Sequence, residues 1–143
     1  MEINGIAHVM LTVSDFAACR PFYDKLLRFL GLKPVIDMDG MLYCVGGRTA
    51  VGIMKADDAH RAERFVQLRV GLHHLCFRAR ERADVDRLYD FARELGAKII
   101  HAPEDGVWAP GYYSVLFEDP DGIRIEMNHV PGKGLLTDQP ATS

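Results

Sequence analysis

Apolar and polar residues alternate along several short stretches of the chain, and this period of two is typical of β-strands with one covered face. The alternation predicts strands over residues 4–13, 41–45, 49–55, 72–79, 97–102, 112–118 and 123–130. Two other stretches repeat their apolar residues every three or four positions, which predicts amphipathic helices. The first helix begins near Ser14-Asp15 and ends at Gly31, and the second ends at Gly96.

The order of these predicted elements restarts near residue 71, and short sequence matches accompany the restart. The segment Gly5-Ile6-Ala7-His8-Val9 corresponds to Gly71-Leu72-His73-His74-Leu75 at an offset of 66. The pair Tyr23-Asp24 corresponds to Tyr89-Asp90 at the same offset. An internal repeat of this length indicates that one structural unit occurs twice in the chain.

Each half is interpreted as one β-α-β-β-β module. A single module is too small to cover its own sheet, so two modules must pair. We therefore expect an α+β fold of two paired βαβββ modules that form one curved sheet around a cleft. The expected organisation is a first module at residues 1–56, a charged linker at 57–70, a second module at 71–130 and a tail at 131–143.

Two histidines occupy equivalent places in the repeat. His8 and His74 stand in matching segments of the two modules, and packing with approximate twofold symmetry would let both point into one cleft. A single histidine on a strand is more often an ordinary structural residue. The case for a functional pair therefore depends on the matching positions of His8 and His74 in the repeat. His73 is adjacent to His74, and strand alternation assigns its side chain to the opposite face.

Glu126 is the only acidic residue within the predicted strand 123–130, which is largely apolar. An unpaired carboxylate in such a strand would be costly to bury. An ion pair with Arg124 would explain the presence of Glu126 in this strand, and Glu126 would then need no catalytic or binding role. Alternatively, two imidazoles and one carboxylate form a suitable ligand set for a divalent metal ion, with positions left open for water or substrate.

Composition narrows the classes of function. The chain has 143 residues, 48% of them hydrophobic and 26% charged, and a net charge of −3. This charge argues against nucleic acid as a partner, and no apolar stretch approaches the ~20 residues of a membrane span. The three cysteines, Cys19, Cys44 and Cys76, are widely spaced and odd in number. Together with the lack of a secretory signal, they lead us to expect a cytoplasmic protein with free thiols.

Three segments resemble the vicinal oxygen chelate superfamily. They are Ile6-Ala7-His8-Val9, His73-His74-Leu75-Cys76-Phe77, and the hairpin from Tyr113 to Glu126 with its turn Asp119-Pro120-Asp121-Gly122. The superfamily includes glyoxalase I, extradiol dioxygenases, methylmalonyl-CoA epimerase, and fosfomycin- and bleomycin-resistance proteins. The resemblance covers residues 3–130 and implies the glyoxalase/bleomycin resistance/dihydroxybiphenyl dioxygenase fold.

The resemblance also implies a metal site. The family ligand positions that match here are His8, His74 and Glu126, which would bind a divalent ion such as Fe²⁺, Mn²⁺, Ni²⁺ or Zn²⁺. The fourth family position falls at Gly52, or at Val51 if the alignment shifts by one, and neither residue can bind a metal. Glyoxalase I and the epimerase carry Glu or Gln there, so this departure argues against the glyoxalase I reaction.

Three classes of function follow from the resemblance. The first is a metal-dependent lyase, isomerase or transferase that binds adjacent oxygens of a small-molecule substrate, with Glu126 as the catalytic residue. The second is an extradiol-type dioxygenase that uses Fe(II). The third is a metal-free drug-binding protein of the bleomycin-resistance type. Because these modules commonly pair across chains in the superfamily, we also expect a homodimer.

Weaker candidates for contact with the substrate come from strand faces and from the aromatic residues before the last hairpin. Met10 and Arg78 share faces with the two histidines by alternation. Trp108, Tyr112 and Tyr113 precede the last predicted hairpin and are candidates for an aromatic wall. From these sets we select Met10, Arg78, Trp108 and Tyr113.

Overall fold

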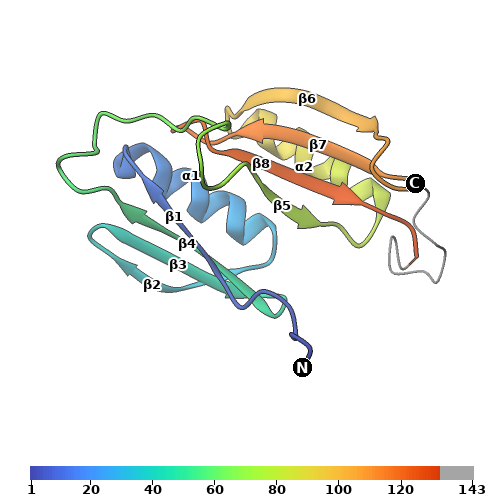
Figure 1. Ribbon diagram of the computed structural model, residues 1–143, viewed down its shortest axis with the longest axis horizontal. Helices are drawn as coiled ribbons and strands as arrows, with labels where there is room; N and C mark the ends of the chain where they lie inside the picture. The colour runs from blue at the N-terminus through green and yellow to red at the C-terminus, as the bar shows by residue number, and fades with distance from the viewer. Residues whose placement is uncertain (133–143) are drawn as a thin grey trace. The chain divides into compact units, whose positions relative to one another are not determined.

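The computed structural model describes residues 1–132, so most of the expected tail at 131–143 lies outside the described residues (Figure 1). Contacts divide the chain into two compact units. The first comprises Met1–Val66 together with Asp119–Gly122, and the second comprises Gln67–Glu118 and the chain from Ile123 onward. The elements follow one another as β1 (Val9–Val13), α1 (Phe16–Phe29), β2 (Lys33–Met38), β3 (Met41–Gly46), β4 (Thr49–Lys55), β5 (Leu75–Arg78), α2 (Arg82–Glu94), β6 (Lys98–Asp105), β7 (Tyr113–Glu118) and β8 (Arg124–His129).

The first unit contains a four-stranded sheet in the order β1-β4-β3-β2, with β1 parallel to β4 and the other pairs antiparallel. Helix α1 packs on one face of this sheet through contacts with β2, β3 and β4. The helix begins where the Asp15 side chain accepts a 3.0 Å hydrogen bond from the Ala18 N–H, which caps its free amino end. It ends at Phe29, and Gly31, two residues later, has a positive φ of 85° that glycine readily adopts.

The second unit repeats this plan, with a four-stranded sheet in the order β5-β8-β7-β6. Strand β5 is parallel to β8, and helix α2 packs against β6, β7 and β8. The start of α2 is capped by Asp84, whose carboxylate accepts a 3.1 Å hydrogen bond from the Glu81 N–H. Val85, Leu88 and Ala92 are buried on the sheet side, which confirms the apolar stripe that the sequence predicts.

The predicted α+β class with two βαβββ modules is confirmed, whereas some details differ. The strand hydrogen bonds form two four-stranded sheets, one in each module, in place of the expected single curved sheet. The sequence pattern did not predict β2, because Lys33–Met38 is almost entirely exposed and therefore shows no alternation. The predicted strand at 4–13 begins only at Val9. The expected linker at 57–70 contains turns but no helix or strand.

The turn Asp119-Pro120-Asp121-Gly122 connects two strands of the second sheet, yet its contacts place it in the first unit. The Tyr23 hydroxyl donates a buried 2.7 Å hydrogen bond to the Asp119 carboxylate. The Asp121 carboxylate accepts hydrogen bonds from the backbone N–H and the hydroxyl of Ser14 at the start of α1. This turn, which forms part of the family resemblance, therefore has a structural role here.

Within residues 1–132, neither helix has the length and apolar character needed to cross a membrane. Helices α1 and α2 contain 14 and 13 residues.

Candidate functional site

His74 and Glu126 lie on neighbouring segments of the second unit. His74 immediately precedes β5, and Glu126 stands in β8, where it is opposite Cys76 in the parallel register. His74 Nε2 and Glu126 Oε2 are 3.0 Å apart. The Glu126 side chain is only 12% exposed, so its charge has few water contacts. The alternative of an ion pair with Arg124 does not occur, because Arg124 Nε pairs with Glu118 at 3.4 Å.

A tyrosine hydroxyl donates a hydrogen bond to the second oxygen of the Glu126 carboxylate. Tyr112 stands just before β7, and its hydroxyl donates a hydrogen bond to Glu126 Oε1. Burial and, after it, this hydrogen bond raise the pKa of Tyr112 to about 12. The phenol is therefore a protonated donor at neutral pH. Both carboxylate oxygens are engaged by side chains that come from outside β8.

His73 contacts the ring of His74, contrary to the alternation argument. The Nδ1 atoms of the two histidines are 2.7 Å apart, and the Gln67 side-chain amide lies 3.2 Å from His73 Nδ1. Strand β5 begins only at Leu75, so alternation does not apply to residues 73 and 74. Neutral His74 takes one of two tautomers: with Nδ1–H donating to His73, Nε2 carries the lone pair that can bind a metal ion, and with the proton on Nε2, Nε2 donates to Glu126.

The pair fits a metal ion in its donor types and in its spacing. Imidazole nitrogen and carboxylate oxygen are common ligands of Zn²⁺, Fe²⁺, Mn²⁺ and Ni²⁺. Two donors that each lie ~2.1 Å from one ion, at the right angle of octahedral coordination, are ~3.0 Å apart. The observed separation of 3.0 Å has this value, which is also that of a direct N–H···O hydrogen bond. Within the described part of the chain, no group of three or more His, Cys, Asp or Glu side chains is assembled for a metal.

His8, the repeat counterpart of His74, lies in the first unit. It immediately precedes β1, it is exposed, and its ring contacts Tyr43 edge-on at a centroid distance of 6.2 Å. The preceding backbone continues alongside β4, because the Ala50 N–H donates to the Ala7 carbonyl at 3.0 Å. The first unit therefore presents His8 at the entry to its first strand, as the second unit presents His74.

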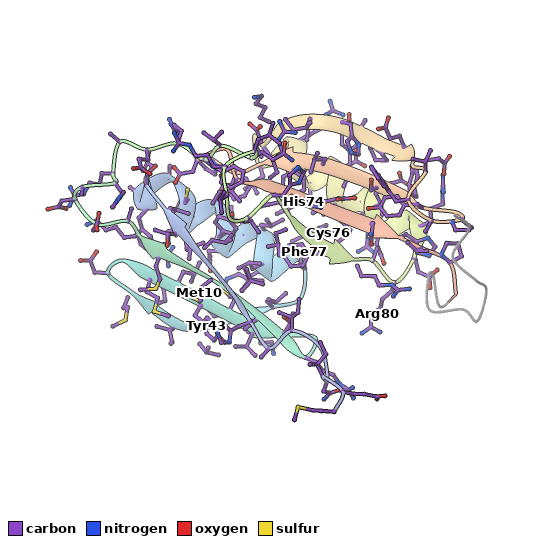
Figure 2. All side chains as sticks on the ribbon, viewed as in Figure 1. Met10, Tyr43, His74, Cys76, Phe77 and Arg80 are labelled. Carbon is purple, nitrogen blue, oxygen red and sulfur yellow. The ribbon has the colours of Figure 1, made fainter. Side chains whose placement is uncertain are left out.

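The fourth family position carries no possible ligand. Gly52 stands in β4 between Met10 of β1 and Tyr43 of β3. A Cβ atom at Gly52 would lie 2.6 Å from Met10 Sδ and 2.8 Å from Tyr43 Cδ2. The space that a ligand side chain would need is therefore filled by a thioether and a phenol ring. Figure 2 labels both side chains on the first sheet.

Cys76 is adjacent to the His74–Glu126 pair, being opposite Glu126 in the register. The residue retains contact with solvent, but desolvation by the surrounding protein, followed by the Glu126 charge, raises the pKa of its thiol to about 12. The thiol is thus protonated at neutral pH and is a weak nucleophile. Cys19 and Cys44 are buried in the first unit, and all three cysteines are free thiols.

The four weaker substrate candidates belong to different elements of the two units. Met10 is in the first unit beside Gly52. Arg78 is exposed and its guanidinium is 3.4 Å from the Gly132 carbonyl. Trp108 lies on the loop between β6 and β7 and is 75% exposed. Tyr113 is held against α2, where its hydroxyl donates to Asp86 at 2.6 Å and the Arg82 guanidinium is 3.5 Å from its ring centroid.

Tyr112 is the residue that sequence reasoning did not assign to the carboxylate. The register of β7 and β8 would have revealed this contact. Leu116 is opposite Glu126, and alternation along the chain from Leu116 puts the Tyr112 side chain on the same face as Glu126. The same alternation places Tyr113 on the other face, toward α2. An aromatic residue near a predicted hairpin therefore needs a strand register before its role can be inferred.

Comparisons with known proteins agree with this architecture. A family model described as the Glyoxalase/Bleomycin resistance protein/Dioxygenase superfamily matches residues 5–127. The uncharacterized protein YqjT of Bacillus subtilis is 29% identical over 121 residues, which are 84% of this chain and 94% of that protein. A candidate glyoxalase from Bacillus halodurans has a TM-score of 0.76 at 26% identity and covers 89% of this chain and 96% of its own. A lactoylglutathione lyase from Agrobacterium tumefaciens has a TM-score of 0.68 at 25% identity, with coverages of 90% and 96%.

Proposed function

Because this chain belongs to the Glyoxalase/Bleomycin resistance protein/Dioxygenase superfamily, we propose that it is a divalent-metal-dependent, glyoxalase-like enzyme. It binds two adjacent oxygens of a small-molecule substrate and acts as a lyase, isomerase or transferase. The proposed ligands are His8, His74 and Glu126. The observation that carries the proposal is the 3.0 Å approach of His74 Nε2 to Glu126 Oε2 beside a largely buried carboxylate.

The side chains around Glu126 support this role. A bound divalent ion would supply Lewis-acid stabilisation of negative charge that develops on substrate oxygens. The contact between His73 and His74 orients the imidazole, with Nε2 directed at Glu126. Tyr112 holds the opposite oxygen of Glu126. Glu126 is the carboxylate that we assign to proton transfer with the substrate.

An Fe(II)-dependent extradiol-type dioxygenase is the second candidate. One observation favours it: Met10 and Tyr43 fill the space beside Gly52, so the chain offers a ligand set of two histidines and one carboxylate without a fourth member. This set is typical of non-haem Fe(II) oxygenases, which keep open positions for oxygen and substrate.

The first experiment measures metal binding by the purified protein. Wild type is titrated calorimetrically with Fe(II) under anaerobic conditions and with Mn(II), Ni(II) and Zn(II). We expect about one ion per chain, and an affinity loss of at least about 100-fold in His8→Ala, His74→Ala and Glu126→Ala, since even residues that merely orient a ligand cost 10–100-fold. His60→Ala removes an exposed histidine outside the site and serves as the control.

Failure of wild type to bind any of these ions would contradict the proposal and favour the metal-free binding protein. Wild-type affinity in both His74→Ala and Glu126→Ala would contradict the ligand assignment. The loaded protein then distinguishes the two reaction classes. Oxygen uptake with a catechol by the Fe(II)-loaded protein identifies the dioxygenase, whereas a metal-loaded protein that consumes no oxygen with catechols favours the lyase, isomerase or transferase class.

The proposal includes a homodimer in the cytoplasm. It is supported by the family membership and by the three free cysteines, which suit a reducing compartment. Light scattering coupled to size-exclusion chromatography measures the mass directly, and a mass near 32 kDa, twice the 16.0 kDa of the chain, is expected.

A further inference from the structure

The loop between β6 and β7 holds Tyr112 in one place. The Gly106 N–H donates to the Tyr112 carbonyl at 2.9 Å, and the Tyr112 N–H donates to the Ala109 carbonyl at 3.0 Å. The Tyr112 ring lies directly on Gly106, because a Cβ atom there would be 2.8 Å from Tyr112 Cδ1. Real side chains do not tolerate such a contact. The position of the ring therefore depends on glycine at residue 106.

The Tyr112 hydroxyl and the His74 ring contact the two different oxygens of the Glu126 carboxylate. Tyr112 donates to Oε1, and His74 Nε2 is 3.0 Å from Oε2. A glutamate has three rotatable side-chain bonds, and contacts from two different segments restrict their rotation. The Cys76 side chain also interacts with this carboxylate. With 12% of the Glu126 side chain exposed, water competes weakly for either oxygen.

We propose that Tyr112 is a positioning residue: its hydroxyl holds Glu126 Oε1 so that Oε2 is directed at His74 Nε2, and Gly106 provides the space in which its ring lies. This inference rests on the proposed role of Glu126 as a metal ligand. It concerns a residue that contacts the ligand without contacting the ion. Partners of this kind orient first-coordination-sphere residues and increase metal affinity.

The first test compares metal affinities of three variants by calorimetry with Zn(II) and Mn(II). Tyr112→Phe removes only the hydroxyl, and we expect an affinity loss of about 10–100-fold. Gly106→Ala keeps the hydroxyl but displaces the ring, and we expect a loss in the same direction. Tyr113→Phe is the matched control, because its hydroxyl donates to Asp86 against α2, and we expect wild-type affinity.

A purely structural role for Tyr112 predicts a different result. In that case Tyr112→Phe would lower the thermal unfolding midpoint and leave the metal affinity unchanged. Wild-type affinity in Tyr112→Phe, when wild type itself binds the ion, overturns the inference and leaves the proposed function intact. Binding by none of the proteins overturns the proposed function.

A second test decides the inference without any metal. Crystal structures of metal-free wild type and metal-free Tyr112→Phe at high resolution show the conformers of Glu126. We expect one ordered carboxylate in wild type and in Tyr113→Phe, and two or more side-chain conformers in Tyr112→Phe. A single unchanged Glu126 conformer in Tyr112→Phe would overturn the proposal, whatever the metal titration shows.

Discussion

The two sheets of this protein have the same strand order but different chemistry at equivalent positions. In the first sheet, Met10, Gly52 and Tyr43 are opposite one another on β1, β4 and β3. In the second sheet, the equivalent row across β5, β8 and β7 is Cys76, Glu126 and Leu116. Each row lies next to a histidine that immediately precedes the first strand, His8 or His74.

The difference shows how a repeated module can carry different chemistry on the same strand order. Gly52 has no side chain, and Met10 and Tyr43 fill the vacant space with apolar atoms. Glu126 is a largely buried carboxylate, and its charge requires the partners His74 and Tyr112. In the second module, burial of the Glu126 charge requires polar partners. In the first module, no charged residue stands at the equivalent position, so apolar atoms can fill the space around Gly52.

The largest effect on stability is expected at the repeated tyrosines, Tyr23 and Tyr89. Tyr23 is 1% exposed and donates to the Asp119 carboxylate, whereas Tyr89 is half-buried with Arg93 5.4 Å from its ring centroid. Hydrogen bonds to charged groups contribute about 1.5–3 kcal/mol, so Tyr23→Phe is expected to lower the free energy of unfolding by that amount. Tyr89→Phe is expected to lower it by less than about 0.5 kcal/mol.

Urea denaturation followed by circular dichroism measures both changes. Equal losses in the two variants would mean that the turn Asp119-Pro120-Asp121-Gly122 does not depend on the Tyr23 hydroxyl. The two modules would then be equivalent in this respect.

A smaller loss is expected at Gly52. The added methyl group in Gly52→Ala requires Met10 and Tyr43 to move, and overpacking costs about 1–3 kcal/mol. Two effects reduce the expected net loss of stability to about 1 kcal/mol: the Met10 side chain is flexible, and alanine lowers the conformational entropy of the unfolded chain relative to glycine. Chemical denaturation of Gly52→Ala, Met10→Ala and the double variant measures the coupling.

If Met10 is the group that fills the space, the double variant will be more stable than the sum of the single losses predicts. Simple additivity of the two losses would show that the methyl group at residue 52 is accommodated elsewhere, and the contrast with Glu126 would lose its steric explanation.

The smallest effect is expected at Cys76, the counterpart of Met10. Because the pKa of its thiol is raised to about 12, alkylation by iodoacetamide should accelerate about tenfold per pH unit between pH 7 and 10. Burial is the first cause of the shift and the Glu126 charge is the second. Glu126→Gln removes a charge that disfavours the thiolate, so it should lower the pKa and speed alkylation modestly, by about 2–5-fold.

Mass spectrometry of the modified peptides separates Cys76 from the buried Cys19 and Cys44, which provide an internal control in the same sample. Slower alkylation of Cys76 in Glu126→Gln would contradict the sign of this electrostatic contribution.

The sequence by itself determined the two modules, the equivalence of His8 and His74, and the unusual position of Glu126. These features are local or periodic, so residue order is sufficient to reveal them. The family resemblance placed the departure at Gly52, because it implies a ligand at that position and the sequence has none there. Strand β2 was missed for the converse reason, since an exposed edge strand has no apolar period.

The tertiary structure alone decided which side chains meet. Tyr112 and Tyr113 are adjacent and chemically identical, yet one contacts Glu126 and the other contacts Asp86 on α2. Their difference arises from the register of β7 and from the loop that places Tyr112 on Gly106. Hydrogen bonds between residues distant in sequence depend on side-chain direction and on close packing, and neither property is encoded in the local pattern of apolar and polar residues.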